Sequence, residues 1–154
     1  VVDFDVHHGN GTQAAFWADA DLMYASTHQY PFYPGTGGAD ERGEDGQGNI
    51  VNAPLDAGAG STEFRQAMSR RIIPALINFA PQLLIISAGF DGHAEDPLAQ
   101  LNLVDDDYLW VTGELMSVAD QTAGGRIVST LEGGYDLAAL GRSVAAHVRT
   151  LMTA

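Results

Sequence analysis

Apolar and polar residues alternate at the start of the chain, which reads V-V-D-F-D-V-H over residues 1–7. Asp3, Asp5 and His7 are the polar members of this alternation. Because alternate side chains of a β-strand point to the same face, the pattern predicts a buried strand whose three polar side chains share one face. The glycine-rich stretch from Gly9 to Thr12 predicts a turn directly after it.

Two other kinds of apolar spacing recur along the chain. Short runs of consecutive apolar residues, typical of strands covered on both faces of a parallel sheet, predict strands over residues 22–27, 83–87 and 126–131. Amphipathic spacing predicts helices over residues 11–18, from residue 61 onward, and over 105–123 and 136–152.

The helix that begins at residue 61 carries an apolar stripe made of Phe64, Met68, Ile72, Leu76 and Phe79. Ser61 is expected to be its N-cap, with Glu63 in the first turn. Pro74 lies inside this helix and is the position at which a kink would arise.

Between residues 28 and 60 the composition changes to a stretch rich in proline and glycine, with a short apolar run at Ile50 and Val51. It is interpreted as a long loop, and loops of this length inside a compact domain are usually functional or disordered. The aromatic residues Tyr30, Phe32 and Tyr33 favour a functional loop that walls a pocket, because disordered linkers are poor in aromatic residues.

The order of the predicted elements indicates an α/β fold with a mainly parallel sheet flanked by helices. In such sheets ligands bind beyond the carboxyl ends of the strands. Polar residues stand at or just past those ends on four predicted strands: Asp5 and His7, Ser26 and His28, Asp91, and the stretch from Glu132 to Tyr135. These residues are therefore expected to meet at one edge of the sheet.

Composition narrows the class of protein. The chain has 154 residues, 45% of them hydrophobic, and neither a basic leader nor an apolar run of membrane-spanning length, which indicates one soluble domain or part of one, with the cytoplasm as the default location. With no cysteine, a metal would be held by Asp, Glu and His. The net charge of −13 disfavours direct binding to nucleic acid and suits a cationic substrate, although surface solubility is the commoner reason for such a balance.

A catalytic metal site needs three protein ligands and open positions, and Asp91 is the candidate for a third ligand beside Asp5 and His7. His93, Glu95 and Asp96 are rivals for that place. Structural alternatives stay open for each residue: Asp3 and Asp5 could cap a turn while His7 and His8 are solvated, Asp91 could form an Asx-turn, and Tyr135 could be a half-buried aromatic residue.

Five stretches of the chain resemble motifs of the histone deacetylase superfamily, which includes acetylpolyamine amidohydrolases and bacterial class II-like amidohydrolases. They are D-F-D-V-H-H-G-N-G-T at 3–12, H-Q-Y-P-F-Y-P-G-T-G at 28–37, G-N-I-V-N-A-P-L at 48–55, S-A-G-F-D-G-H-A-E-D-P-L at 87–98 and L-E-G-G-Y-D at 131–136. Their order is that of the family and they cover nearly the whole chain. Some members carry aspartate at the position of Asn10, and asparagine there resembles the class II-like members. The residues of the five motifs as a whole also resemble the bacterial, class II-like members.

The resemblance implies the three-layer arginase/deacetylase fold and a metal-dependent hydrolase that acts on linear amide bonds. Its metal ligands would be Asp5, His7 and Asp91, holding zinc or another divalent metal such as Fe2+, and Tyr135 would donate its hydroxyl to the substrate carbonyl. Tyr33 and Leu98 would line a narrow tunnel for an acylated lysine peptide or an acetylpolyamine. A structural potassium site would use three residues: Asp3, Asp5 and Ser26.

The family's tandem histidine pair, its general base and acid, belongs upstream of Val1. Residues 1–154 are therefore expected to be the carboxyl-terminal part of one deacetylase-like domain whose amino-terminal part is absent, and the isolated chain is expected to be inactive. The alternative function is a non-catalytic metal-binding or interaction fragment. A two-metal enzyme of the arginase type is disfavoured by the single ligand set and Tyr135.

Overall fold

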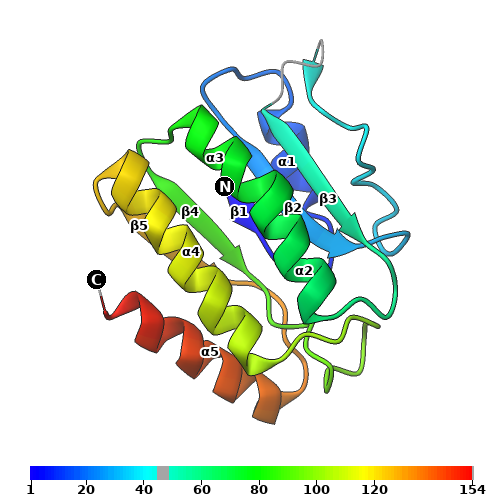
Figure 1. Cartoon of the computed structure of the whole chain (residues 1–154). Helices are drawn as coiled ribbons and strands as arrows, with labels where there is room; N and C mark the ends of the chain where they lie inside the picture. The colour runs from blue at the N-terminus through cyan, green and yellow to red at the C-terminus, as the bar shows by residue number, and fades with distance from the viewer. Residues whose placement is uncertain (45–48, 154) are drawn as a thin grey trace.

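The computed structural model describes residues 1–44 and 49–153, and its centre is a five-stranded sheet (Figure 1). The strand order is β3-β2-β1-β4-β5 and every neighbouring pair is parallel. The strands are β1 (Val2–Asp3), β2 (Tyr24–Gln29), β3 (Ile50–Leu55), β4 (Leu84–Ala88) and β5 (Ile127–Leu131). The predicted α/β class with a parallel sheet is confirmed.

Helices flank the sheet on both faces. The helical elements are α1 (Asn10–Phe16), α2 (Ser61–Ala67), the π-helical turn η2 (Met68–Ile72), α3 (Ile73–Phe79), α4 (Asp105–Ala123) and α5 (Leu137–Leu151). Helices α2, α3 and α4 cover one face with α5 beside α4, and α1 lies on the other face (Figure 1). This division follows from right-handed crossovers, because the connection from β1 to β2 runs across the sheet in the opposite direction to the helical connections from β3 to β4 and from β4 to β5. Within the described residues no helix is long and apolar enough to cross a bilayer.

Strand β3 lies inside the stretch that was predicted as one long loop, so that prediction is wrong for residues 50–55. Asn52 and Pro54 interrupt its apolar pattern. Proline lacks an N–H group and is tolerated in a strand at the edge of a sheet, which is where β3 lies. Residues 45–48, which belong to the same stretch and include the first residue of the 48–55 motif, lie outside the described residues.

The helix predicted from residue 61 begins there, but its N-cap is Gly60 and not Ser61. The Glu63 carboxylate accepts a hydrogen bond from the Gly60 N–H at 3.0 Å, whereas the Ser61 hydroxyl donates to Oδ2 of Asp107 on α4 at 2.6 Å. Ser61 therefore joins two helices instead of capping one.

The apolar stripe of this helix repeats every four residues, at Phe64, Met68, Ile72 and Leu76, and all four side chains are buried. In a regular α-helix a four-residue step rotates by about 40° beyond a full turn, so such a stripe would drift around the helix. The wider π-helical turn over 68–72 counteracts this drift. It lies just before Pro74, which has no N–H to give to the carbonyl of Arg70.

Candidate metal centre

Asp5, His7 and Asp91 converge at the carboxyl edge of the sheet, with one potential ligand atom of each within 4.8 Å of the others. Nδ1 of His7 lies 3.0 Å from Oδ1 of Asp5 and 3.1 Å from Oδ2 of Asp91. Asp5 and His7 follow β1, and Asp91 follows the neighbouring strand β4. The three residues that the sequence selected as ligands are thus brought together.

The path of residues 3–7 differs from the predicted strand, because β1 ends at Asp3. Oδ1 of Asp3 accepts a hydrogen bond from the Asp5 N–H at 3.0 Å, and Oδ1 of Asp5 accepts one from the His7 N–H at 2.8 Å. Two successive Asx-type turns, and not strand alternation, therefore aim His7 at Asp5. Asp3 and Asp5 thus cap turns, as one structural alternative expected, and Asp5 is at the same time part of the ligand cluster.

Asp91 is fully buried, and its two carboxylate oxygens differ in their surroundings. Oδ1 accepts a hydrogen bond from the Val6 N–H at 2.9 Å, so the residue does not form the local Asx-turn considered from sequence. Oδ2 has no hydrogen-bond partner among the described residues, although it faces His7. Burial, and after it the negative charge of Asp5, raises the pKa of Asp91 to about 7.

A buried carboxylate oxygen without a partner is rare in folded proteins and costs about 1–3 kcal/mol. A divalent cation between Asp91, Asp5 and His7 would remove this cost and would also offset the repulsion between the two carboxylates. Two carboxylates and an imidazole are a donor set that suits zinc with open coordination positions. The residues present therefore fit a divalent metal.

Two glycines let the backbone approach this cluster closely. A Cβ atom at Gly133 would collide with Oδ2 of Asp91, and one at Gly89 would collide with Oδ2 of Asp5. The Gly133 N–H donates to the same Asp5 oxygen at 2.8 Å. The loop after β5 thus lies directly against the proposed ligands and brings Tyr135 with it.

The three rivals for the ligand role are engaged elsewhere. Nε2 of His93 lies 3.3 Å from Oδ1 of Asp105, and Glu95 pairs with Arg142 at 2.7 Å. Oδ2 of Asp96 accepts the Tyr135 N–H at 2.7 Å. None of the three belongs to the ligand cluster of the described residues.

Tyr135 borders a pocket of about 430 Å3 at the cluster, whose other lining residues are Asp3, Asp5, His7, His8, Gly9, Ser87, Leu131, Glu132 and Gly133. The tyrosine is 52% exposed. Burial, followed by the charges of Asp91 and Asp5, raises the pKa of Tyr135, so its hydroxyl keeps its proton at neutral pH and can act as a donor.

Of the two predicted tunnel residues, Tyr33 lies beside the cluster and Leu98 does not contact it directly. The Tyr33 ring is edge-on to the His7 ring at 6.3 Å, and Phe32 stacks on the same imidazole at 5.4 Å. Tyr33 is 77% exposed and Leu98 53% exposed, so both could contact a ligand. Phe32 makes the closer aromatic contact with His7, but neither Phe32 nor Tyr33 is among the residues that line the 430 Å3 pocket, so their role as a pocket wall stays a prediction.

Asp3 and Ser26 are register neighbours on β1 and β2, and both are buried. Oδ2 of Asp3 accepts a hydrogen bond from the Tyr24 hydroxyl at 3.0 Å, and the Ser26 hydroxyl lies 2.9 Å from Nδ1 of His28. Burial, opposed in part by the Asp5 N–H bond, raises the pKa of Asp3 to about 7. The potassium role of these residues stays a prediction.

A buried polar network under the segment after β2 was not anticipated from sequence. His8, expected to be solvated in the structural alternative, is buried between Thr36 and Gln13, at 2.8 and 2.9 Å. Glu41 accepts hydrogen bonds from the backbone N–H groups of Gly37 and Gly38. Asn52 joins the network by donating to Oε1 of Gln13 at 2.7 Å, across 39 positions, so spacing in the sequence gave no signal for it.

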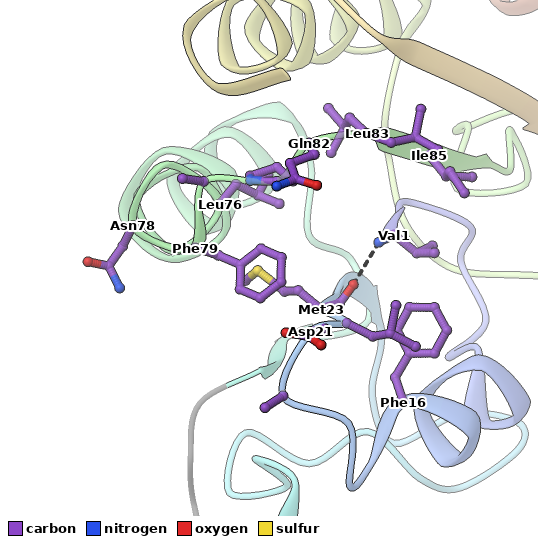
Figure 2. Close-up of a pocket in the computed structure, with 15 residues that line it drawn as sticks. Val1, Phe16, Asp21, Met23, Leu76, Asn78, Phe79, Gln82, Leu83 and Ile85 are labelled. Atoms are coloured by element: carbon purple, nitrogen blue, oxygen red, sulfur yellow. Dashed lines mark hydrogen bonds between the residues drawn. The ribbon is translucent and has the colours of Figure 1, made fainter. Parts of the chain in front are cut away.

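A second, larger pocket of about 880 Å3 lies at the opposite, amino end of the strands and includes Val1, Met23, Leu76, Phe79 and Leu83 (Figure 2). Asp21 is the one acidic side chain that lines it. Among the described residues, no cluster of three potential metal ligands occurs at this pocket.

A parallel sheet with a carboxylate–imidazole–carboxylate cluster at its carboxyl edge defines an α/β domain suited to binding a divalent cation. The chain belongs to the histone deacetylase family, since the model of the histone deacetylase domain matches residues 1–151. The predicted arginase/deacetylase fold is confirmed by two solved structures. One is the HDA15 HD domain, with a TM-score of 0.91, 38% identity and coverage of 99% of this chain and 43% of that one. The other is the acetylpolyamine aminohydrolase from Burkholderia pseudomallei, with a TM-score of 0.88, 32% identity and coverage of 97% and 43%.

Among curated relatives, the chain is 43% identical over 153 residues to "Histone deacetylase 10, chloroplastic" from Oryza sativa subsp. japonica, covering 99% of the chain and 34% of the relative. It is 46% identical over 137 residues to the "Histone deacetylase-like amidohydrolase" from Pseudomonas aeruginosa, covering 88% and 36%. The chain thus spans about a third of the length of these relatives.

Proposed function

We propose that the chain carries the metal centre and the oxyanion donor of a zinc-dependent amidohydrolase that removes acetyl or other acyl groups from lysine side chains or polyamines. The observation that carries the proposal is the unpartnered, buried Oδ2 of Asp91 facing Asp5 and His7, next to Tyr135. The names of the relatives, histone deacetylase and acetylpolyamine aminohydrolase, support the substrate class.

In this proposal Asp5, His7 and Asp91 hold the metal, which would supply a Lewis acid and an acidified water. Tyr135 donates its hydroxyl to the substrate carbonyl and stabilises the negative charge that develops on that oxygen. Phe32 orients the His7 ring by stacking on it. Tyr33 and Leu98 guide the acyl-lysine or acylpolyamine chain, and the acidic balance of the protein favours such a cationic substrate.

We also propose that Asp3, Asp5 and Ser26 hold a structural potassium ion. Support comes from the adjacency of Asp3 and Ser26 in the sheet and from the buried carboxylates of Asp3 and Asp5, which a monovalent cation would stabilise. The cytoplasmic location and the bacterial source expected from the sequence stay predictions, and two of the relatives are named chloroplastic.

We propose further that residues 1–154 form the carboxyl-terminal part of a larger deacetylase domain. Strand β5 is the last strand at its side of the described sheet (Figure 1), and Leu131 and Leu137 near it are exposed. An apolar groove of about 490 Å3 continues from there along α5, lined by Leu131, Leu137, Leu140, Gly141, Val144, Ala145 and Val148. Further residues of the same domain would cover this groove and extend the sheet at β5.

The alternative function, a metal-binding fragment without catalysis, is favoured by one observation on the histidines. His7 belongs to the ligand cluster, whereas His8, His28, His93 and His147 all have ring nitrogens engaged with other side chains or the backbone. Within the described residues, therefore, no imidazole is free beside the cluster to act as a general base. In the proposed enzyme this group comes from the remaining part of the domain.

The test of the proposed function is the Tyr135→Phe variant of the full-length protein, assayed on an acetyl-lysine peptide and on an acetylpolyamine. Loss of an oxyanion donor should lower kcat by about 10² to 10³-fold while the bound zinc per chain stays unchanged. If turnover stays within about threefold of the parent, less than about 1 kcal/mol, Tyr135 has no part in the mechanism.

Zinc titration of the isolated chain in the same experiment separates the two functions. The amidohydrolase proposal expects one zinc per chain without turnover, and turnover once the full-length protein is used. A full-length protein that binds zinc but turns over neither substrate would support the non-catalytic alternative.

A further inference from the structure

We infer that Asp96 is a positioning residue for Tyr135, an inference that rests on the proposed function of Tyr135 as the oxyanion donor. Asp96 lies in the loop between β4 and α4, and its carboxylate is 8% exposed. Oδ2 accepts hydrogen bonds from the N–H groups of Tyr135 at 2.7 Å and Asp136 at 3.3 Å. The carboxylate thus holds the backbone from which the Tyr135 side chain leaves.

The backbone before Tyr135 is intrinsically free to rotate, because Gly133 and Gly134 precede it and Gly134 has a φ of 142°. Gly133 is fixed by its own bonds to Asp5 and Phe90, but the fixed point lies upstream of the Gly134 hinge. The Tyr135 hydroxyl makes no hydrogen bond within the described residues. After the hinge, Asp136 is held by the first turn of α5, because it accepts hydrogen bonds from the Ala139 and Leu140 N–H groups. Asp96 adds the hold on the N–H of Tyr135 itself.

The loop that carries Asp96 is itself anchored. Its Ala94 N–H donates to the Leu103 carbonyl at 2.8 Å, and the Leu103 N–H donates to the Gly92 carbonyl at 3.1 Å. The same loop contains the ligand Asp91 at its start. Asp96 therefore ties Tyr135 to the loop that carries Asp91, which fixes the backbone of Tyr135 relative to the residues that would hold the metal.

The other carboxylate oxygen of Asp96 accepts the Leu98 N–H at 3.0 Å. Leu98 is one of the two proposed tunnel residues. One buried side chain thus sets the backbone positions of both the oxyanion donor and a tunnel residue, which are 37 positions apart in the chain. Loss of the carboxylate is therefore expected to displace the Tyr135 hydroxyl by about 1 Å, and not to remove it from the site.

The experiment combines Asp96→Asn with Tyr135→Phe in the full-length, zinc-loaded protein. The amide keeps the shape of the side chain but replaces an acceptor by a donor facing N–H groups. We expect kcat to fall by about 10- to 100-fold with bound zinc unchanged, since misplacement by about 1 Å costs up to 100-fold. In the Tyr135→Phe background the same substitution should have little further effect on kcat. Fully additive losses would overturn the inference, because Asp96 would then act independently of the hydroxyl.

A readout that does not depend on activity is the 19F NMR spectrum of the protein labelled with 3-fluorotyrosine. Asp96→Asn should shift or broaden the Tyr135 resonance, assigned through Tyr135→Phe, and leave buried Tyr24 unchanged. Glu95→Gln is the matched control, because Glu95 is the neighbouring acid and pairs with the exposed Arg142; it should change neither the spectrum nor kcat. An unaltered Tyr135 resonance in Asp96→Asn would refute the inference. If the parent protein deacetylates no substrate, the proposed function fails, and the spectrum still decides whether Asp96 positions Tyr135.

Discussion

A pocket lies at each end of the sheet. The larger one is at the amino end, whereas the potential metal ligands lie at the smaller one, at the carboxyl end. The pocket at the amino end is about twice as large as the one at the carboxyl end, about 880 Å3 against about 430 Å3. Figure 2 shows apolar side chains around the larger pocket together with the polar side chains of Asp21, Asn78 and Gln82. The Val1 amine donates a hydrogen bond to the Met23 carbonyl at 2.6 Å. The smaller pocket holds Asp5, His7 and Tyr135.

What distinguishes the candidate site from the amino-end pocket is a buried polar atom without a hydrogen-bond partner, and not the volume of the pocket. At the carboxyl end the buried Asp91 keeps an oxygen without a partner, and burial raises its pKa. Such an arrangement opposes folding unless a ligand compensates for it. At the amino end, no buried side chain that lines the pocket is left without a partner among the described residues.

The largest effect should separate the two ends directly. Asp91→Asn removes a ligand charge while it keeps the shape of the side chain, and should lower zinc affinity by at least about 10³-fold, about 4 kcal/mol, since even indirect supports of a ligand are worth 10- to 100-fold. Asp21→Asn at the amino-end pocket is the matched control. Isothermal titration with zinc measures both, and equal affinities in the two variants would remove the carboxyl end as the metal site.

The next effect concerns the amino end. Leu76→Ala enlarges the larger pocket and deletes a buried member of the helical stripe, so we expect a loss of about 3 kcal/mol in the free energy of unfolding. Ile77→Ala, on the exposed neighbour, should cost less than about 1 kcal/mol. Urea unfolding measures both variants, and zinc affinity of the folded protein should not change. Reduced zinc affinity in Leu76→Ala would mean that the two ends are coupled.

The smallest effect tests a buried polar group whose hydrogen bonds are met. His147 of α5 contacts the Thr112 hydroxyl with Nδ1 at 2.6 Å and the Ser129 hydroxyl with Nε2 at 2.8 Å, and the rings of Phe4 and Phe90 pack on it. Burial lowers the pKa of His147, so the folded state favours the neutral ring. As the pH falls below the pKa of the unfolded state, about 6.5, the unfolded chain binds the proton more readily than the folded chain. The free energy of unfolding therefore decreases as the pH falls.

Compared with His147→Gln, the parent should therefore lose more unfolding free energy between pH 7.5 and pH 5.5, by at most about 1.4 kcal/mol per pH unit. The raised pKa values of Asp3 and Asp91 act in the opposite direction, but they are common to both proteins and cancel in the difference. Urea unfolding at the two pH values gives the result. Parallel curves for the two proteins would show that His147 does not titrate differently in the folded state.

Regular periodicity in the sequence predicted the long elements well, and long-range contacts explain where it failed. Helix α4 has the predicted bounds, because acidic residues mark its start and glycine its end. Strand β3 was missed because Asn52 interrupts its apolar pattern and because Pro54 is tolerated in a strand at an edge, a position that the local pattern does not reveal.

The rule that carboxyl ends of parallel strands meet at one edge predicted that Asp5, His7 and Asp91 would cluster, and the structure confirms that they do. It did not predict the Asx-type turns that bend residues 3–7, nor the hold of Asp96 on Tyr135, which spans 39 positions. Contacts of this kind depend on where two loops end in space, and a single sequence does not carry that information.

The π-helical turn between α2 and α3 has a consequence for protein engineering. Its four-residue stripe follows neither the heptad nor the regular α-helical template, so a designer who replaces residues 61–79 by an ideal helix of equal length would place Phe64 and Leu76 about 120° apart around the axis. One of the two would then point to solvent. Grafts and idealised scaffolds based on this domain therefore need the wide turn at residues 68–72 to be kept as a unit.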